Sequence, residues 1–197
     1  MTPVPNLQAV LEEMNAPFPG GRMSASQLGD ILARLVWESF SDYLVDPRNR
    51  SFLERLGITL NEGVPEDGVA EEILIFHMWA HSRAVQLAYF NTVPEEGIRE
   101  ILDHLHMAVF EDMVAHGTPE AQLPVFEQRV AGRYAEYNQA AAASDEHVGS
   151  AILRHLARMP GERRRAAVQA LTRQAVELAS PLRDYLEGVE LVSEPQG

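Results

Sequence analysis

Apolar residues recur at intervals of three and four along most of the chain, and proline or glycine interrupts the pattern at its boundaries. This spacing places apolar side chains on one face of an α-helix. No stretch of useful length alternates apolar with polar residues, as a half-buried β-strand does. The sequence therefore predicts an all-α fold, a single helical bundle of five or more main helices.

The proline and glycine residues that interrupt the helical pattern divide the chain into four parts. Residues 1–23 are expected to form an N-terminal arm, with a short helix over Leu7–Met14. Residues 24–143 form the predicted bundle core, and residues 144–188 a C-terminal helical hairpin. Residues 189–197 are expected to be a frayed tail. Core helices are predicted at 24–44, 47–56, 69–90, 94–116 and 118–143, with a loop at 59–68.

The hairpin is predicted to turn at Pro160-Gly161, between one helix at 146–158 and a second that runs to about Leu186. Pro181 lies inside the second helix. Because proline lacks a backbone N–H and its ring clashes with the preceding turn, we expect it to kink or break that helix.

Two residue types are missing. There is no cysteine, which excludes disulfides, thiolate metal ligands and a cysteine nucleophile. All 16 basic residues are arginine. Without lysine, a phosphate-binding loop of the Walker type and Schiff-base chemistry are also excluded.

The net charge of −13 argues against general nucleic-acid binding. The longest apolar run, Ile73–Phe76, is too short to span a membrane, and the first residues lack the pattern of a signal peptide. We therefore expect a cytoplasmic protein. Arg163, Arg164 and Arg165 form a local basic cluster that would suit an acidic partner, or that simply solubilises the helix.

The 69–90 helix carries the main chemical lead. His77 and His81 are four residues apart and share one apolar face of this helix. Residues 91–94 form a short turn, so the 94–116 helix is expected to pack antiparallel to it. That register brings Asp112 within about one turn of His77, with His104 and Glu111 as neighbours to one side.

This group allows three interpretations. Asp112 accepts hydrogen bonds from the histidines and pins two helices together, because a buried carboxylate needs a partner. Alternatively, His77, His81 and Asp112 hold zinc or iron(II), for which two imidazoles and a carboxylate are suitable ligands. The third interpretation is a proton-transfer pair that serves an organic substrate.

Large apolar residues outside the main stripes favour a further prediction. Trp79 and Phe90 lie on a second face of the 69–90 helix, and Trp37 lies off the stripe of its own helix. Such a surplus marks a central helix or a partner surface. We therefore expect an interaction or assembly module that binds protein, including a second copy of itself. The alternative is an enzyme or ligand sensor with its site at His77, His81 and Asp112.

Overall fold

The computed structural model describes residues 21–192, and it confirms the all-α prediction with seven α-helices in that range. The predicted Leu7–Met14 helix and residues 193–197 lie outside the described residues. The helices are α2 (Ala25–Val45), α3 (Pro47–Arg55), α4 (Asp67–Tyr89), α5 (Glu95–Ala115), α6 (Leu123–Ala143), α7 (Asp145–Leu156) and α8 (Gly161–Leu186). A single 3₁₀ turn, η1 (Glu120–Gln122), precedes α6.

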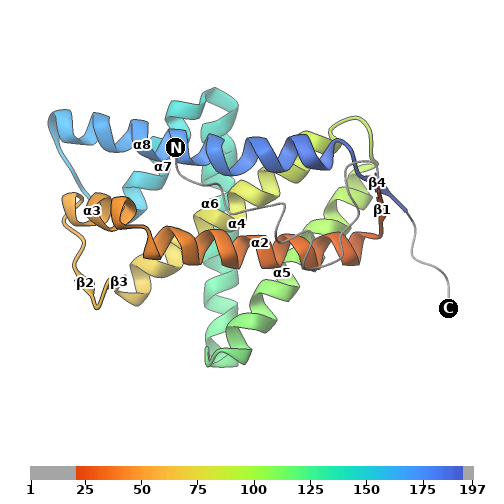
Figure 1. The fold of residues 1–197 in the computed structure, drawn as a ribbon, viewed down its shortest axis with the longest axis horizontal. Coiled ribbons are helices and arrows are strands. Elements are labelled where there is room, and N and C mark those ends of the chain that lie inside the picture. Colours follow the sequence, from red (N-terminus) through yellow and green to blue (C-terminus); the bar gives the residue numbers. More distant parts are fainter. Residues whose placement is uncertain (1–20, 193–197) are drawn as a thin grey trace.

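Helix α4 is central, as the sequence predicts. It contacts α2, α5, α6, α7 and α8, and every residue from Glu72 to Ser82 is buried. Figure 1 shows α4 passing between α2 and α8, which run along the long axis of the molecule. Because neighbours surround α4, its second apolar face is used within the fold.

The predicted antiparallel pairing of the 69–90 and 94–116 helices is wrong. Helix α5 diverges from α4 after the turn and crosses α2, which is its main contact (Figure 1). Gly29 makes this packing close: a Cβ added there would lie 2.3 Å from the Cβ of His104. The missing side chain lets the two helices approach, and the buried stripe Ile101, Leu105, Val109 faces that contact.

The C-terminal hairpin is confirmed, and α7 and α8 pack closely on each other. A Cβ at Gly149 would lie 2.4 Å from the carbonyl oxygen of Val168, so only glycine fits this crossing. Helix α8 does not break at Pro181. Proline has no N–H to donate, so the backbone carbonyl of Glu177 lacks its usual hydrogen bond within the helix. Glu177 is an exposed residue, so water can supply that bond instead.

Four two-residue strands complete the described chain. In one pair, β1 (Arg22–Met23) lies parallel to β4 (Glu190–Leu191), and Val189 is buried beside it, so residues 189–192 are not frayed. The other pair, β2 (Leu60–Asn61) and β3 (Val64–Pro65), lies inside the predicted loop. Glu62 and Gly63 connect these two strands, both with positive φ, as in a type I′ hairpin turn.

Ser24 begins α2 with a reciprocal cap. Its Oγ accepts a hydrogen bond from the backbone N–H of Gln27, and the Gln27 Oε1 accepts one from the backbone N–H of Ser24. Two N–H groups that a helix leaves without partners are thus satisfied. Within residues 21–192, no helix combines the length and the hydrophobicity that a membrane crossing needs.

Candidate functional site

A cleft of about 720 Å³ opens between the C-terminal half of α2, helix α3 and the middle of α8. Its wall includes Ser39 and Tyr43 of α2 and His77 of α4, and all three are buried. Ligand sites in proteins commonly have about 300–1,000 Å³ and a few polar groups in an apolar lining. The cleft therefore has the dimensions of a small-molecule site.

Ser39 and His77 form a buried hydrogen-bonded pair. The Ser39 hydroxyl donates to the backbone carbonyl of Val36 at 2.9 Å, so it accepts from the Nδ1–H of His77, also at 2.9 Å. This arrangement leaves His77 Nε2 as a bare acceptor, and no partner for it lies among residues 21–192. Burial lowers the pKa of His77 to about 3, and repulsion from His81 adds to the drop. The imidazole is neutral at pH 7.

Tyr43 contributes a second polar side chain to the wall. Its side chain is 4% exposed, and its hydroxyl has no hydrogen-bond partner in the described part of the chain. Burial raises the pKa of Tyr43, so the phenol keeps its proton and offers a donor. The Tyr43 ring also packs edge-on against His77, with the ring centroids 5.6 Å apart.

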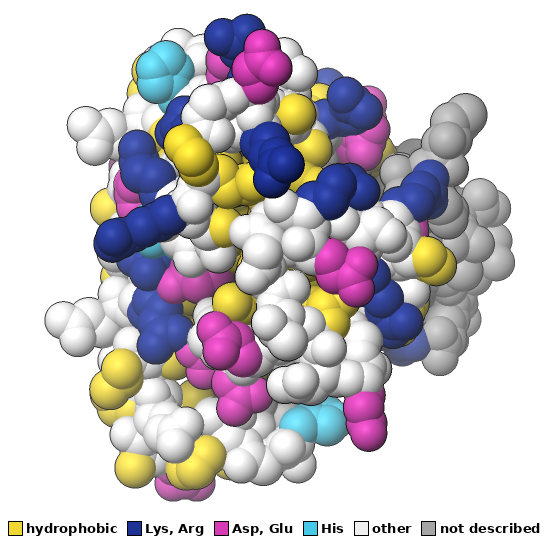
Figure 2. All heavy atoms as spheres, turned by 90° about the vertical axis from the view of Figure 1, so that its left-hand side faces the viewer, with side chains coloured by type: hydrophobic (Ala, Val, Ile, Leu, Met, Phe, Trp, Pro, Cys, Tyr) yellow, Lys and Arg dark blue, Asp and Glu magenta, His cyan; other side chains and the backbone are white. Residues whose placement is uncertain are grey.

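Charged side chains surround the mouth of the cleft. Arg48 forms an ion pair with Asp46 at 2.9 Å and interacts electrostatically with Glu177. Arg55 and Arg173 also line the cleft, and neither has an ion-pair partner within residues 21–192. Figure 2 looks onto this end of the molecule and shows basic side chains gathered around patches of hydrophobic surface.

A separate polar network joins three helices away from the cleft. Tyr134 Oη of α6 lies 3.1 Å from Ser82 Oγ of α4 and 3.0 Å from His106 Nε2 of α5. Burial lowers the pKa of His106, which favours the neutral ring that can accept the Tyr134 proton. Because each group has a partner within the network, it holds helices together rather than presenting a free reactive group.

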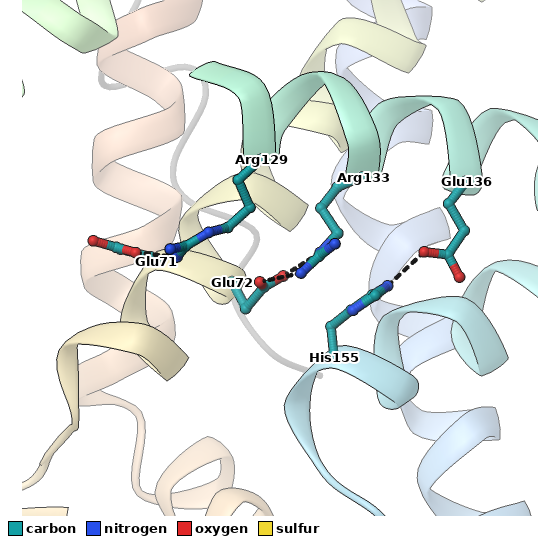
Figure 3. Close-up of polar contacts among 6 residues, drawn as sticks. All are labelled: Glu71, Glu72, Arg129, Arg133, Glu136 and His155. Atoms are coloured by element: carbon teal, nitrogen blue, oxygen red, sulfur yellow. Dashed lines mark hydrogen bonds and ion pairs between the residues drawn. The ribbon is translucent and has the colours of Figure 1, made fainter. Parts of the chain in front are cut away.

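Ion pairs fix α6 against α4 and α7. Arg133 of α6 binds both carboxylate oxygens of Glu72 on α4, at 2.7 and 2.8 Å, and Arg129 pairs with Glu71 one turn away (Figure 3). Glu136 of α6 pairs with His155 of α7, and the same view shows all these groups on one side of α6. Their charges are matched within the fold, so they account for helix packing.

The structure brings together only part of the predicted histidine site. His77 and His81 are both buried, as expected, and the Nδ1–H of His81 donates to the carbonyl of His77 at 2.8 Å. Asp112 is half-buried on α5 and makes no side-chain hydrogen bond to either histidine. Within residues 21–192, no three His, Cys, Asp or Glu side chains form a group that could hold a metal ion.

The structure also shows where the other residues named from the sequence lie. His104 lies against Gly29 at the α2–α5 crossing, and Glu111 is exposed. Trp79 is buried, and its Nε1–H donates to Asn138 Oδ1 at 2.9 Å, so its surplus apolar surface is covered by α6. Trp37 is half-buried, whereas Phe90 is 71% exposed.

Comparisons of the chain with protein-family models, curated proteins and solved structures each find no match.

Sequence reasoning found His77 but missed the groups that surround it. Ser39 follows Leu35 by four residues and Val36 by three, so it falls on the apolar stripe of α2. A serine hydroxyl on the apolar stripe of a helix indicates that it has a hydrogen-bond partner in the core. Arg55 and Arg173 gave no comparable signal, because they are far apart in the sequence and only the fold makes both of them line one cleft.

Proposed function

We propose that this protein binds a small organic molecule in the cleft between α2, α3 and α8. The observation that carries the proposal is His77, which lines the cleft and whose buried Nε2 has no partner among residues 21–192. A buried polar group without a hydrogen bond costs about 1–3 kcal/mol. A ligand donor at this nitrogen removes that cost.

Binding is favoured over catalysis at this site. A general base works best when its pKa lies near the working pH, and the pKa of His77 is about 3. The Nδ1–H of His77 is also held by Ser39, so the ring is fixed in one orientation. These properties suit a group that orients a ligand. We therefore propose a ligand carrier or sensor. The sequence suggested a sensor as part of its alternative function, with the site at His77, His81 and Asp112.

The test uses a neutral aromatic probe, 1-naphthylacetamide, followed by NMR shifts of backbone amides in the full chain. Saturable shifts around Ser39 and Tyr43, with a dissociation constant of about 1 mM or tighter, support the proposal. An Ala170→Phe variant fills the cleft from α8 and should weaken binding at least about tenfold.

The matched control is Val176→Phe, which adds the same ring at an α8 position that is 42% exposed and does not line the cleft. This variant should bind the probe like the unmodified chain. Absence of saturable shifts, or equal binding by the Ala170→Phe chain with an unchanged melting temperature, overturns the proposal.

Self-association is a second candidate function, and exposed Phe90 favours it. Phe90 is 71% exposed at the end of α4, and Leu87, one turn earlier, is 42% exposed. These two residues are the first candidates for a contact with a second copy. Sedimentation of the chain and of a Phe90→Glu variant tests this. A dimer that the substitution dissociates supports the contact, and a monomer of about 22 kDa at micromolar concentrations contradicts it.

The exposed arginines at the start of α8 remain a candidate surface for an acidic partner. Arg163, Arg164 and Arg165 are all exposed, and the Arg164 guanidinium donates to Ser150 Oγ at 2.8 Å. Arg163 and Arg165 have no ion-pair partner within the described residues. This surface supports an electrostatic contact with an acidic protein.

A further inference from the structure

Some charged side chains in the cleft have an ion-pair partner and others do not. Asp46 accepts hydrogen bonds from the Arg48 guanidinium and backbone, and these bonds hold the pKa of Asp46 below its usual value. Glu177 interacts electrostatically with the same Arg48. The positive charge of Arg48 is therefore already neutralised within the protein.

Two guanidinium groups remain available at the mouth. Arg55 approaches from the end of α3 and Arg173 from α8, and both are exposed to solvent. Neither arginine has an ion-pair partner among residues 21–192, so its charge is not neutralised within that part of the fold. Three carboxylates of the described residues line the cleft, and Asp42 is the one that does not interact with Arg48. Asp42 is exposed near the end of α2.

The interior of the same cleft is largely apolar. Phe52 of α3, Leu178 and Ala170 of α8, and the ring of Tyr43 contribute carbon surface to its wall. Tyr43 supplies a hydroxyl donor in the wall, and the guanidiniums supply donors at the mouth. Tyr43, Arg55 and Arg173 thus donate hydrogen bonds, and His77 Nε2 is the neutral acceptor among the lining groups.

We propose that the ligand of the cleft is an organic acid, with an apolar body inside and a carboxylate held at the mouth by Arg55 and Arg173. A guanidinium binds a carboxylate through two parallel N–H donors, which gives direction as well as charge. The apolar body covers Phe52 and Leu178. This inference rests on the proposed function, because it names the class of ligand for the same cleft.

The test compares two probes of nearly equal shape, 1-naphthylacetate and 1-naphthylacetamide, on the full chain. They differ in the charge of the end group. The acetate should bind at least about tenfold more tightly than the amide, and added salt should narrow this difference because it screens exposed charges.

Arg55→Gln and Arg173→Gln variants test whether these two arginines cause the preference for acetate over the amide. Each should reduce the ratio of acetate to amide affinity several-fold, and the double variant should bring it to within about twofold, because acetate binding falls more than amide binding. Arg165→Gln is the matched control, since Arg165 is an exposed arginine of α8 outside the cleft. It should preserve the ratio.

The outcomes separate the two proposals. If neither probe binds, the cleft is not a ligand site and both proposals fail. If both probes bind equally, or the amide binds better, the cleft is a ligand site and the assignment of an anionic ligand is wrong. A preference for acetate that survives in the double variant also overturns the assignment to these arginines.

Discussion

Gly29 of α2 lies so close to His104 of α5 that a methyl group on Gly29 would stand 2.3 Å from the His104 Cβ and 3.0 Å from the backbone nitrogen of Leu105. Backbone atoms cannot move aside as a side chain does. We therefore expect Gly29→Ala to push the helices apart and to lower the free energy of unfolding by about 3 kcal/mol, the upper end of typical overpacking costs. Urea denaturation measures this loss.

Gly132→Ala is the matched control for that substitution. Gly132 lies inside α6, and a Cβ there would meet nothing within 4 Å. The control should raise the free energy of unfolding by up to about 1 kcal/mol, because alanine favours the helix more than glycine does. Equal effects of the two alanines would contradict the close packing of α2 on α5.

The Ser39–His77 pair leads to a second prediction. Ser39→Ala removes the acceptor of the His77 Nδ1–H inside the core and should cost about 1–3 kcal/mol of stability. Ser41→Ala, on the exposed side of the same helix, should change stability by less than about 0.5 kcal/mol. A small loss for Ser39→Ala would show that the imidazole has another partner.

Stability should fall on acidification because of two buried histidines. Burial lowers the pKa of His77 to about 3 and of His81 to about 4. Below pH of about 6.5 the unfolded chain binds protons that the folded chain does not, so unfolding becomes easier as the pH decreases. Above that pH both states hold neutral imidazoles, and these groups add no pH dependence.

Denaturation at pH 7, 6 and 5 measures the slope. Each buried histidine should contribute about 1.4 kcal/mol per pH unit once the pH is well below 6.5. His81→Leu should remove about half of the slope that His77 and His81 produce together. Substitution of exposed His147 by Asn is the control and should leave the slope unchanged. An NMR titration in which the His77 ring protonates near pH 6 would contradict this explanation.

Two neighbouring tyrosines should respond in opposite ways to loss of the hydroxyl. Tyr134 has hydrogen-bond partners in Ser82 and His106, so Tyr134→Phe should cost about 1–2 kcal/mol. The hydroxyl of Tyr137 is fully buried with no partner among residues 21–192, so Tyr137→Phe should be neutral or stabilising. Thermal unfolding of both variants gives the comparison, and a loss at Tyr137 similar to that at Tyr134 would mean that Tyr137 also has a partner.

The Glu72–Arg133 ion pair should contribute strongly to the position of α6. Glu72→Gln leaves Arg133 without its carboxylate in a site where the glutamate side chain is 9% exposed. The expected loss is about 3 kcal/mol, the lower end for broken buried pairs, because the arginine side chain keeps 25% exposure. Glu96→Gln in the exposed Arg99–Glu96 pair should change stability by less than about 1 kcal/mol.

Helix positions were predictable from sequence because their signals are local. Pro47 starts α3 and Gly117 follows α5, close to the expected boundaries, since a helix ends where backbone geometry or capping requires it. The β2–β3 hairpin was missed because its turn contains Glu62 at positive φ, which is uncommon for a residue with a side chain.

Helix partners were not predictable in the same way. The apolar stripe of α5 suits α2 and α4 equally well by periodicity, and the short turn at residues 91–94 favoured α4. The choice depends on close contact at Gly29, which joins residues about 75 positions apart in the sequence. Asp112 lies on α5 and makes no side-chain hydrogen bond to His77, whose Nδ1–H donates to Ser39.

The pairing of β1 with β4 joins Arg22 to Glu190, so the described chain nearly closes into a ring. This pairing joins residues that are almost as far apart in sequence as the described chain allows. The loop-closure entropy that it costs is offset only after the helices between the two strands have packed. This contact is thus expected late in folding. Because residues 22 and 190 are adjacent, a direct link between the two ends of the described part would suit circular permutation, with new termini at the exposed Pro160-Gly161 turn.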